Sequence, residues 1–293
     1  MKKVFLLLCG MLVAAVSFGE NFPNDFQAAL KLVNEGKIIE AEEAFLKLAG
    51  QKAGKRATDE SMAQAAYCAL AQKKFDQAVE YAGKIGDKPL GTLCRMKILQ
   101  KQNKWDEILS LSKSEEIDKW PDAMIYDGML CRGRAYAARQ EAPGAEKDFV
   151  AAGKNTLSAD DKAFAMQNLG DLYREVVKDN CKASETYAAI IKMQGIHPNR
   201  LRGAATSLAK LLAAEGRGDE AVTALDGVKA DKDKDFYRYS SLQMCYGEVY
   251  EIIGKKPEAL ARYKAVAGLE KANADLREKA QRKIEELEKE QGK

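Results

Sequence analysis

The fold is decided most clearly by residues 244–269, which read MCYGEVYEIIGKKPEALARYKAVAGL. Apolar and small residues recur there at three- and four-residue steps on both sides of a turn at residues 254–257. Such spacing places them on one face of a helix. The stretch therefore predicts two short amphipathic helices that pack as a hairpin. Their shared face consists of Tyr246, Gly247, Tyr250 and Ile253, followed by Ala259, Tyr263, Val266 and Leu269.

Similar segments recur along the chain at offsets of roughly 30–39 residues. Their order, aromatic-Gly-x-x-Tyr, then Ala, then an aromatic residue, resembles the tetratricopeptide repeat (TPR) pattern, whose period is about 34 residues. Leu169-Gly170-x-x-Tyr173 is another local match. The resemblance implies an all-α fold: a right-handed superhelical α-solenoid of about seven TPR-like hairpins plus a C-terminal capping helix. Small residues at helix crossings let the axes approach to about 8–10 Å, and stacking buries what one hairpin leaves exposed.

We predict a repeat array over residues 20–271. The expected units are 22–55, 59–88, 89–117, 126–158, 163–197, 202–231 and 240–271. The third unit is degenerate, because Ile108 and Ser112 replace the expected alanine and aromatic residue. The fifth needs one extra residue in its turn, near residues 179–182. Residues 272–293 form the predicted capping helix and tail, with one apolar stripe made by Leu276, Ala280, Ile284 and Leu287.

Residues 1–19, MKKVFLLLCGMLVAAVSFG, have the features of a secretory signal peptide. Two lysines precede a short apolar run, and small residues end the segment. The alternative, an uncleaved anchor, is disfavoured because the run is shorter than the roughly 20 residues of a spanning helix. We expect the mature chain to be exported and to lack a transmembrane segment. The periplasm is the favoured location, and secretion from the cell is the alternative.

Composition argues against nucleic-acid binding. The formal charge is +3, and removal of Lys2 and Lys3 with the signal leaves +1. A nearly neutral chain offers no strong field for phosphate backbones. Five cysteines would remain after cleavage, an odd number, so at least one must stay free. We interpret them as small apolar fillers of helix faces, the alternative being a disulfide between neighbouring helices.

No catalytic or metal-binding motif stands out, so we expect no enzyme activity, cofactor or metal site. The chain has a single histidine, His197, in a link between units. Asp231, Asp233 and Asp235 alternate like the start of a calcium loop, but Leu242 occupies the position where such a loop needs glutamate. We interpret these residues as a polar link.

The TPR resemblance implies that the first helix of each hairpin lines a concave groove that binds an extended peptide or a helix of another protein. The groove positions that we predict are Phe26, Leu30, Tyr67, Lys97, Arg134, Asp171, Arg174, Lys210 and Glu248. Lys97, Arg134 and Lys210 would favour an acidic or amphipathic partner. The alternative is that these charges form an ordinary solvated face.

These features predict a non-enzymatic scaffold of the cell envelope that binds partner proteins in its groove. The alternative is a structural factor that self-associates during assembly of an envelope or secretion complex. Light scattering would separate the two, since a monomer at micromolar concentration argues against self-association. A hydrolase or transferase has almost no support in the sequence.

Overall fold

The computed structural model describes residues 22–51 and 53–291. The predicted signal segment, residues 1–19, lies outside the described residues. The described part contains α-helices with short 3-10 and π segments and no strand. None of its helices combines the length and the apolar character that crossing a bilayer requires. The chain divides after Asn155 into two compact units, which are described separately.

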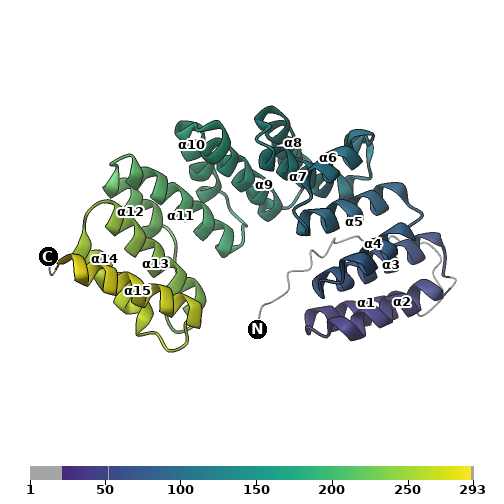
Figure 1. The fold of residues 1–293 in the computed structure, drawn as a ribbon, viewed down its shortest axis with the longest axis horizontal. Helices are drawn as coiled ribbons and strands as arrows, with labels where there is room; N and C mark the ends of the chain where they lie inside the picture. Colours follow the sequence, from purple (N-terminus) through teal and green to yellow (C-terminus); the bar gives the residue numbers. More distant parts are fainter. Residues whose placement is uncertain (1–21, 52, 292–293) are drawn as a thin grey trace. The chain divides into compact units, whose positions relative to one another are not determined.

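The first unit contains four helical hairpins (Figure 1). Each second helix also packs on the first helix of the following hairpin, as α2 does on α3. A 3-10 turn, Ile117–Lys119, precedes the fourth hairpin. The helices are α1 (Phe22–Asn34), α2 (Ile38–Gly50), α3 (Lys55–Ala71), α4 (Phe75–Gly83), α5 (Lys88–Lys101), α6 (Trp105–Lys113), α7 (Asp122–Ala138) and α8 (Ala142–Lys154).

The second unit contains three hairpins and a terminal helix, α15 (Ala274–Gln291), which packs on α14 and α13. The hairpin helices are α9 (Ala159–Leu172), α10 (Asn180–Ile191), α11 (Pro198–Ala214), α12 (Gly218–Asp226), α13 (Phe236–Ile252) and α14 (Lys256–Ala267). The prediction of an all-α solenoid of seven hairpins and a capping helix is confirmed. The right-handed superhelical path stays a prediction.

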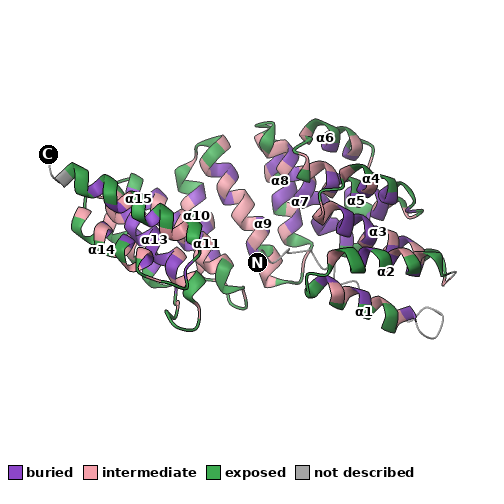
Figure 2. Cartoon of the chain, turned by 60° about the horizontal axis from the view of Figure 1, so that its bottom comes forward, coloured by how far each residue is buried: buried purple, intermediate pink, exposed green. Residues whose placement is uncertain are grey.

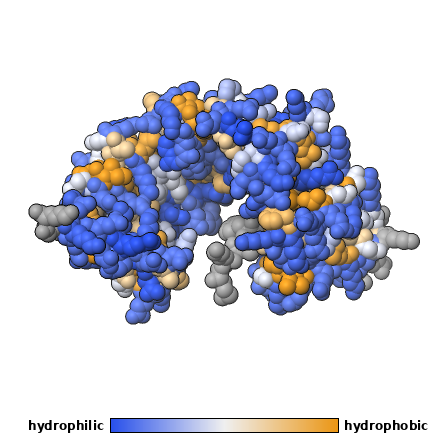
Figure 3. Space-filling model, in the orientation of Figure 1, coloured by the Kyte–Doolittle hydropathy of each residue, from blue (hydrophilic) through white to orange (hydrophobic). Residues whose placement is uncertain are grey.

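Within each unit, buried residues lie where helices face one another, and hydrophilic side chains cover most of the visible surface (Figures 2 and 3). Small residues make the crossings possible. A Cβ atom on Gly170 of α9 would lie 2.5 Å from the ring of Tyr187 on α10, and one on Gly133 would lie 2.8 Å from Phe149. The glycines are therefore the holes that receive the aromatic knobs of the second helices.

The seven hairpins share a left-handed residue at the turn, and six of them share one turn geometry. A residue with a left-handed backbone follows each first helix, with φ between 57° and 79°. In six hairpins the next N–H donates to the carbonyl five residues earlier, as Lys74 does to Ala69 at 3.0 Å. That bond and the left-handed residue define a Schellman helix end. The left-handed residues are Gly36, Lys73, Asn103, Gln140, Lys178, Gly216 and Gly254.

The fifth hairpin differs by one residue. Its first helix ends in a π turn, Tyr173–Val177, and the N–H of Asp179 donates to the carbonyl of Tyr173, six residues earlier, at 2.9 Å. A π turn holds one residue more than an α turn. The extra residue that the sequence requires is therefore accommodated before the turn, at the end of α9, and our placement of it near residues 179–182 was wrong.

Replacing Lys73 by glycine should stabilise the first unit by about 0.5–1 kcal/mol. Lys73 has φ 62°, a conformation that costs a residue with a Cβ atom roughly 1–2 kcal/mol and costs glycine little. The greater freedom of glycine in the unfolded chain removes part of the gain. Urea unfolding followed by circular dichroism measures the change. The control is Gly36→Ala, at φ 79° with open space around its Cβ position, which should lower the free energy of unfolding by a similar amount. Equal stability of Lys73→Gly and wild type would contradict the explanation.

Candidate functional site

The predicted groove residues at the N-terminal end are partly or fully buried. The ring of Phe26 lies 5.3 Å from that of Phe45 on α2, in an edge-to-face arrangement, and Leu30 is half-buried. Tyr67 on α3 is buried, with 9% of its surface exposed. Phe26 therefore contributes to packing of α1 on α2, and Tyr67 is too buried to present an open surface to a partner.

Lys97 is not an open groove cation. Its ammonium nitrogen lies 2.8 Å from a carboxylate oxygen of Asp127 on α7, and both side chains are almost buried, at 11% and 8% exposure. The same nitrogen lies 5.5 Å from the ring centroid of Tyr67. Its positive charge is thus neutralised inside the first unit, where it joins α5 to α7. Arg134 lies half-buried on α7. A charge reversal at Lys97 would disturb the stack and so test nothing about a partner.

Asp171 and Arg174 form part of the fifth hairpin's own polar network. The hydroxyl of Tyr187 donates to Asp171 at 2.6 Å, and Arg174 lies 3.4 Å from the same carboxylate. Burial and this carboxylate both raise the pKa of Tyr187. The phenol therefore stays protonated and donates throughout the neutral range, which ties α10 to α9.

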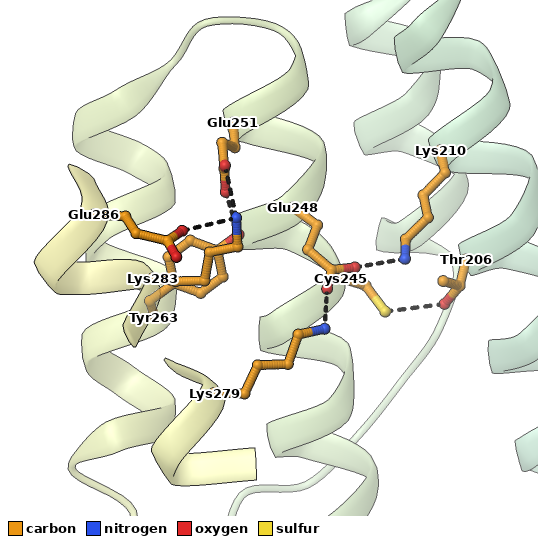
Figure 4. Close-up of polar contacts among 9 residues, drawn as sticks. All are labelled: Thr206, Lys210, Cys245, Glu248, Glu251, Tyr263, Lys279, Lys283 and Glu286. Carbon is orange, nitrogen blue, oxygen red and sulfur yellow. Dashed lines mark hydrogen bonds and ion pairs between the residues drawn. The ribbon is translucent and has the colours of Figure 1, made fainter. Parts of the chain in front are cut away.

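The two C-terminal groove residues lie in a cluster that joins three helices (Figure 4). Lys210 of α11 and Lys279 of α15 lie 2.5 Å and 2.6 Å from the two carboxylate oxygens of Glu248 on α13. One turn further along α13, Glu251 accepts from Lys283 at 2.9 Å and from the hydroxyl of Tyr263 at 2.8 Å. These contacts fix both the carboxylates and the lysine stems.

An open recess of about 450 Å³ lies over this cluster. Lys210 and Lys279 are more accessible than the carboxylate between them, since they are 41% and 49% exposed and Glu248 is 18% exposed. Lys283 and Glu251 are similarly exposed, at 29% and 33%. Ile252 adds an apolar surface that is 49% exposed. The recess thus presents cations and one apolar side chain to solvent. Its lining residues are Lys210, Glu248, Glu251, Ile252, Lys279 and Lys283.

Four of these six residues are not among the predicted groove positions. The apolar stripe of α15 predicts a cap, but not that the residues beside the stripe reach α13. Lys279 and Lys283 directly precede Ala280 and Ile284 of the stripe. That spacing is the signal that could have placed both lysines along the edge where α15 meets α13.

Glu248 should make the second unit sensitive to acid. Burial acts to raise its pKa, but the hydrogen bonds and charges of Lys210 and Lys279 outweigh it and hold the pKa below the ordinary 4.5. The stabilisation is therefore present above about pH 4.5 and is lost as the pH falls through the lowered value. We expect wild type to lose about 1 kcal/mol more than Glu248→Gln between pH 6 and pH 3. Urea unfolding at both values measures this, and parallel losses would contradict it.

The cysteines of the described residues are all free thiols. Four are buried, and burial raises the pKa of Cys68 and Cys94 to about 12 and that of Cys131 to about 11. Cys181 is exposed, and Glu185 beside it raises its pKa. A thiol with a raised pKa is a weak nucleophile at neutral pH. The buried four fit the interpretation as apolar fillers, whereas Cys181 lies at the surface.

The predicted link residues have local structural roles. The Asp231 carboxylate accepts from two backbone N–H groups of its own turn, and Asp235 caps α13 by accepting from the N–H of Arg238. His197 caps α11 through Nδ1, which accepts from Asn199. No group of three or more histidine, cysteine, aspartate or glutamate side chains in the described ranges is arranged to hold a metal ion.

The fold has counterparts among solved structures. A tetratricopeptide repeat protein from Parabacteroides merdae matches with a TM-score of 0.55 at 14% identity, over 91% of this chain and 99% of that one. The C-terminal part of a TPR repeat-containing protein from Cytophaga hutchinsonii matches with a TM-score of 0.49 at 17% identity, over 86% of this chain and 97% of that one. No protein-family model and no curated protein sequence matches the chain. The chain therefore has the fold of tetratricopeptide repeat proteins, and the predicted resemblance is confirmed at the level of the fold.

Proposed function

We propose that the chain is a non-enzymatic scaffold that holds a segment of another protein over the recess between α11, α13 and α15. The observation that carries the proposal is the layering of charge there. Lys210 and Lys279 are more exposed than the Glu248 carboxylate that positions them, and Ile252 provides an apolar contact. A segment that carries acidic side chains around one apolar residue is complementary to this surface.

The apolar contact is needed for affinity. Exposed ion pairs contribute only about 0–1 kcal/mol each, and the lysines already have carboxylate partners. Burial of Ile252 against an apolar residue of the partner contributes a favourable free energy of binding that does not depend on exchange of ion pairs. The lysines would then govern which partner binds and how fast it associates.

The chemistry of the described residues supports a binding role. Burial raises the pKa of the thiols of Cys68, Cys94 and Cys131, which leaves them protonated at neutral pH. The recess is open, and its polar groups are engaged with one another. We further propose that the protein works in the cell envelope, a location supported by the signal-like residues 1–19.

Site-specific crosslinking in the native cell tests the proposal. A photoreactive phenylalanine analogue at Ile252, in the recess, should yield a discrete crosslinked product whose second component mass spectrometry identifies. The matched control places the analogue at Val79 of α4, which is 46% exposed compared with 49% for Ile252. The Val79 product should be absent or different. The same products at both positions, or none at Ile252, would refute the assignment, and a crosslink to a second copy of this chain would favour self-association.

Neutralising two lysines of the recess provides a second test of the proposal. Lys210→Gln with Lys279→Gln should reduce the Ile252 product at least fivefold. The control pair is Lys256→Gln with Lys264→Gln, because these lysines also form ion pairs with α15, through Glu290 and Glu288, but lie outside the recess. Equal losses of the crosslinked product with both pairs of substitutions would show that the product depends only on the docking of α15 and not on the charges of the recess.

A further inference from the structure

A second recess, of about 320 Å³, lies on the opposite side of α13. Tyr239, Gln243 and Tyr250 share one helical face at 3.6 residues per turn, whereas Glu248 and Ile252 lie on the other face. The second recess is therefore separate from the proposed partner site. It is lined by Tyr239, Gln243, Tyr250, Glu258, Ala261, Arg262 and Ala265.

Arg262 of α14 lies against two tyrosine rings in this recess. Its guanidinium carbon lies 4.6 Å from the ring centroid of Tyr246 and 5.8 Å from that of Tyr250, and the two rings are stacked with an interplanar angle of 24°. Its Nη1 donates to Oε1 of Gln243 at 2.9 Å. A guanidinium fixed by two rings and an amide loses little freedom when it binds a ligand.

The charge of Arg262 is not neutralised within the described part of the chain, where its contacts are with the two rings and the amide. Glu258 lines the same recess one helical turn earlier but is not ion-paired with it. Asp226 accepts the hydroxyl of Tyr246. With Nη1 engaged, the edge formed by Nε and Nη2 remains for a ligand. That edge presents two parallel N–H groups at the spacing of a carboxylate.

We propose that this recess is a second binding site, which takes a carboxylate-bearing peptide segment. Arg262 binds the carboxylate through two hydrogen bonds, and Tyr239 and Tyr250 contact an aromatic neighbour of the acidic residue. Charge complementarity with Arg262 selects the acid, and Glu258 weakens binding through like-charge repulsion. This inference goes beyond the proposed function, because the two sites lie on opposite faces of α13.

Two peptides of matched sequence test the proposal by isothermal titration calorimetry. The acidic probe is acetyl-Gly-Phe-Glu-Asp-Phe-Gly-amide, and its neutral counterpart carries Gln and Asn in place of the two acids. We expect the acidic probe to bind wild type at least tenfold more tightly than the neutral one. Arg262→Gln should remove that preference, and Arg262→Lys should retain only part of it because lysine cannot form the paired hydrogen bonds. No binding of the acidic probe at 1 mM, or equal binding to Arg262→Gln, would overturn the proposal.

Two further variants separate this site from the first recess and from effects on folding. Glu258→Gln should tighten binding of the acidic probe about threefold, a gain that loss of folding cannot produce. Lys210→Gln with Lys279→Gln should leave the part of the binding that depends on Arg262 unchanged. If only the lysine pair weakens binding, the probe occupies the first recess, so the second site is refuted while the proposed function stands. Weaker binding to Glu258→Gln would likewise contradict the geometry.

Discussion

Gly170→Ala is expected to destabilise the second unit by about 1–2 kcal/mol. The new Cβ atom would lie 2.5 Å from Cε1 of Tyr187, whose side chain is fully buried and whose hydroxyl donates to Asp171. The ring cannot move away without breaking that hydrogen bond or separating α9 from α10. Overpacking of this kind costs about 1–3 kcal/mol, and the better helix propensity of alanine recovers only about 1 kcal/mol. Urea unfolding followed by circular dichroism measures the change.

The control is Gly203→Ala in α11 of the same unit. Nothing lies within 4 Å of a Cβ atom built there, so only the helix propensity changes. We expect this variant to gain about 0.5–1 kcal/mol. Equal effects at Gly170 and Gly203 would mean that the close approach of α9 and α10 does not limit the fold.

Ile284→Asp is expected to release α15 from the second unit. Ile284 belongs to the narrow apolar contact that α15 makes with Met244, Tyr263 and Val266. Burial of an isoleucine contributes about 1.5–3 kcal/mol, and a buried carboxylate without a partner costs more than that. The helix should therefore undock before the rest of the unit unfolds. Amide protection within residues 274–291 should fall about 100-fold, measured by hydrogen exchange and mass spectrometry.

Gln281→Asp introduces the same residue on the exposed face of α15 and serves as its control. In this variant the amide protection of residues 274–291 should change less than threefold. Release of α15 should also expose Tyr263 and Val266 and increase binding of a hydrophobic dye. Unchanged protection in Ile284→Asp would show that the ion pairs of Lys279 and Lys283 suffice to hold the helix.

The sequence predicts the fold well because small and bulky residues directly report where helices cross. Gly170 and Tyr187 occupy the positions that the spacing assigns to a hole and its knob. Even the degenerate third hairpin keeps this arrangement, since Ile108 and Ser112 are both buried at the positions where an alanine and an aromatic residue were expected. Burial follows the period of the repeat even where the residue type does not.

The location of the extra residue in the fifth hairpin could not be predicted in the same way. A π turn and a longer loop contain the same number of residues, and the residues 173–177 carry no glycine or proline to mark a break. Tyr173, the first residue of the π turn, is buried in the core of the second unit, a tertiary contact that the local sequence does not show.

The candidate site could be predicted only in part. Lys210 and Glu248 are positions that the repeat phase identifies, and both line the recess. Repeat phase cannot show whether a charge is open or paired, because the partner lies on another helix. The partner of Lys97 is Asp127, and that of Glu248 includes Lys279, each about thirty residues away along the chain. Such pairs depend on the offset between successive helices, which only the folded stack defines.

The ion pairs between neighbouring first helices also bear on how the array could be re-engineered. Lys210 on α11 faces Glu248 on α13, and Glu248 in turn faces Lys279 on α15. Deleting the hairpin α13–α14 and joining α12 to α15 would place lysine opposite lysine. The segments are thus not interchangeable modules, and a chimeric array would have to transplant residues 198–291 as one block to keep its charges compatible.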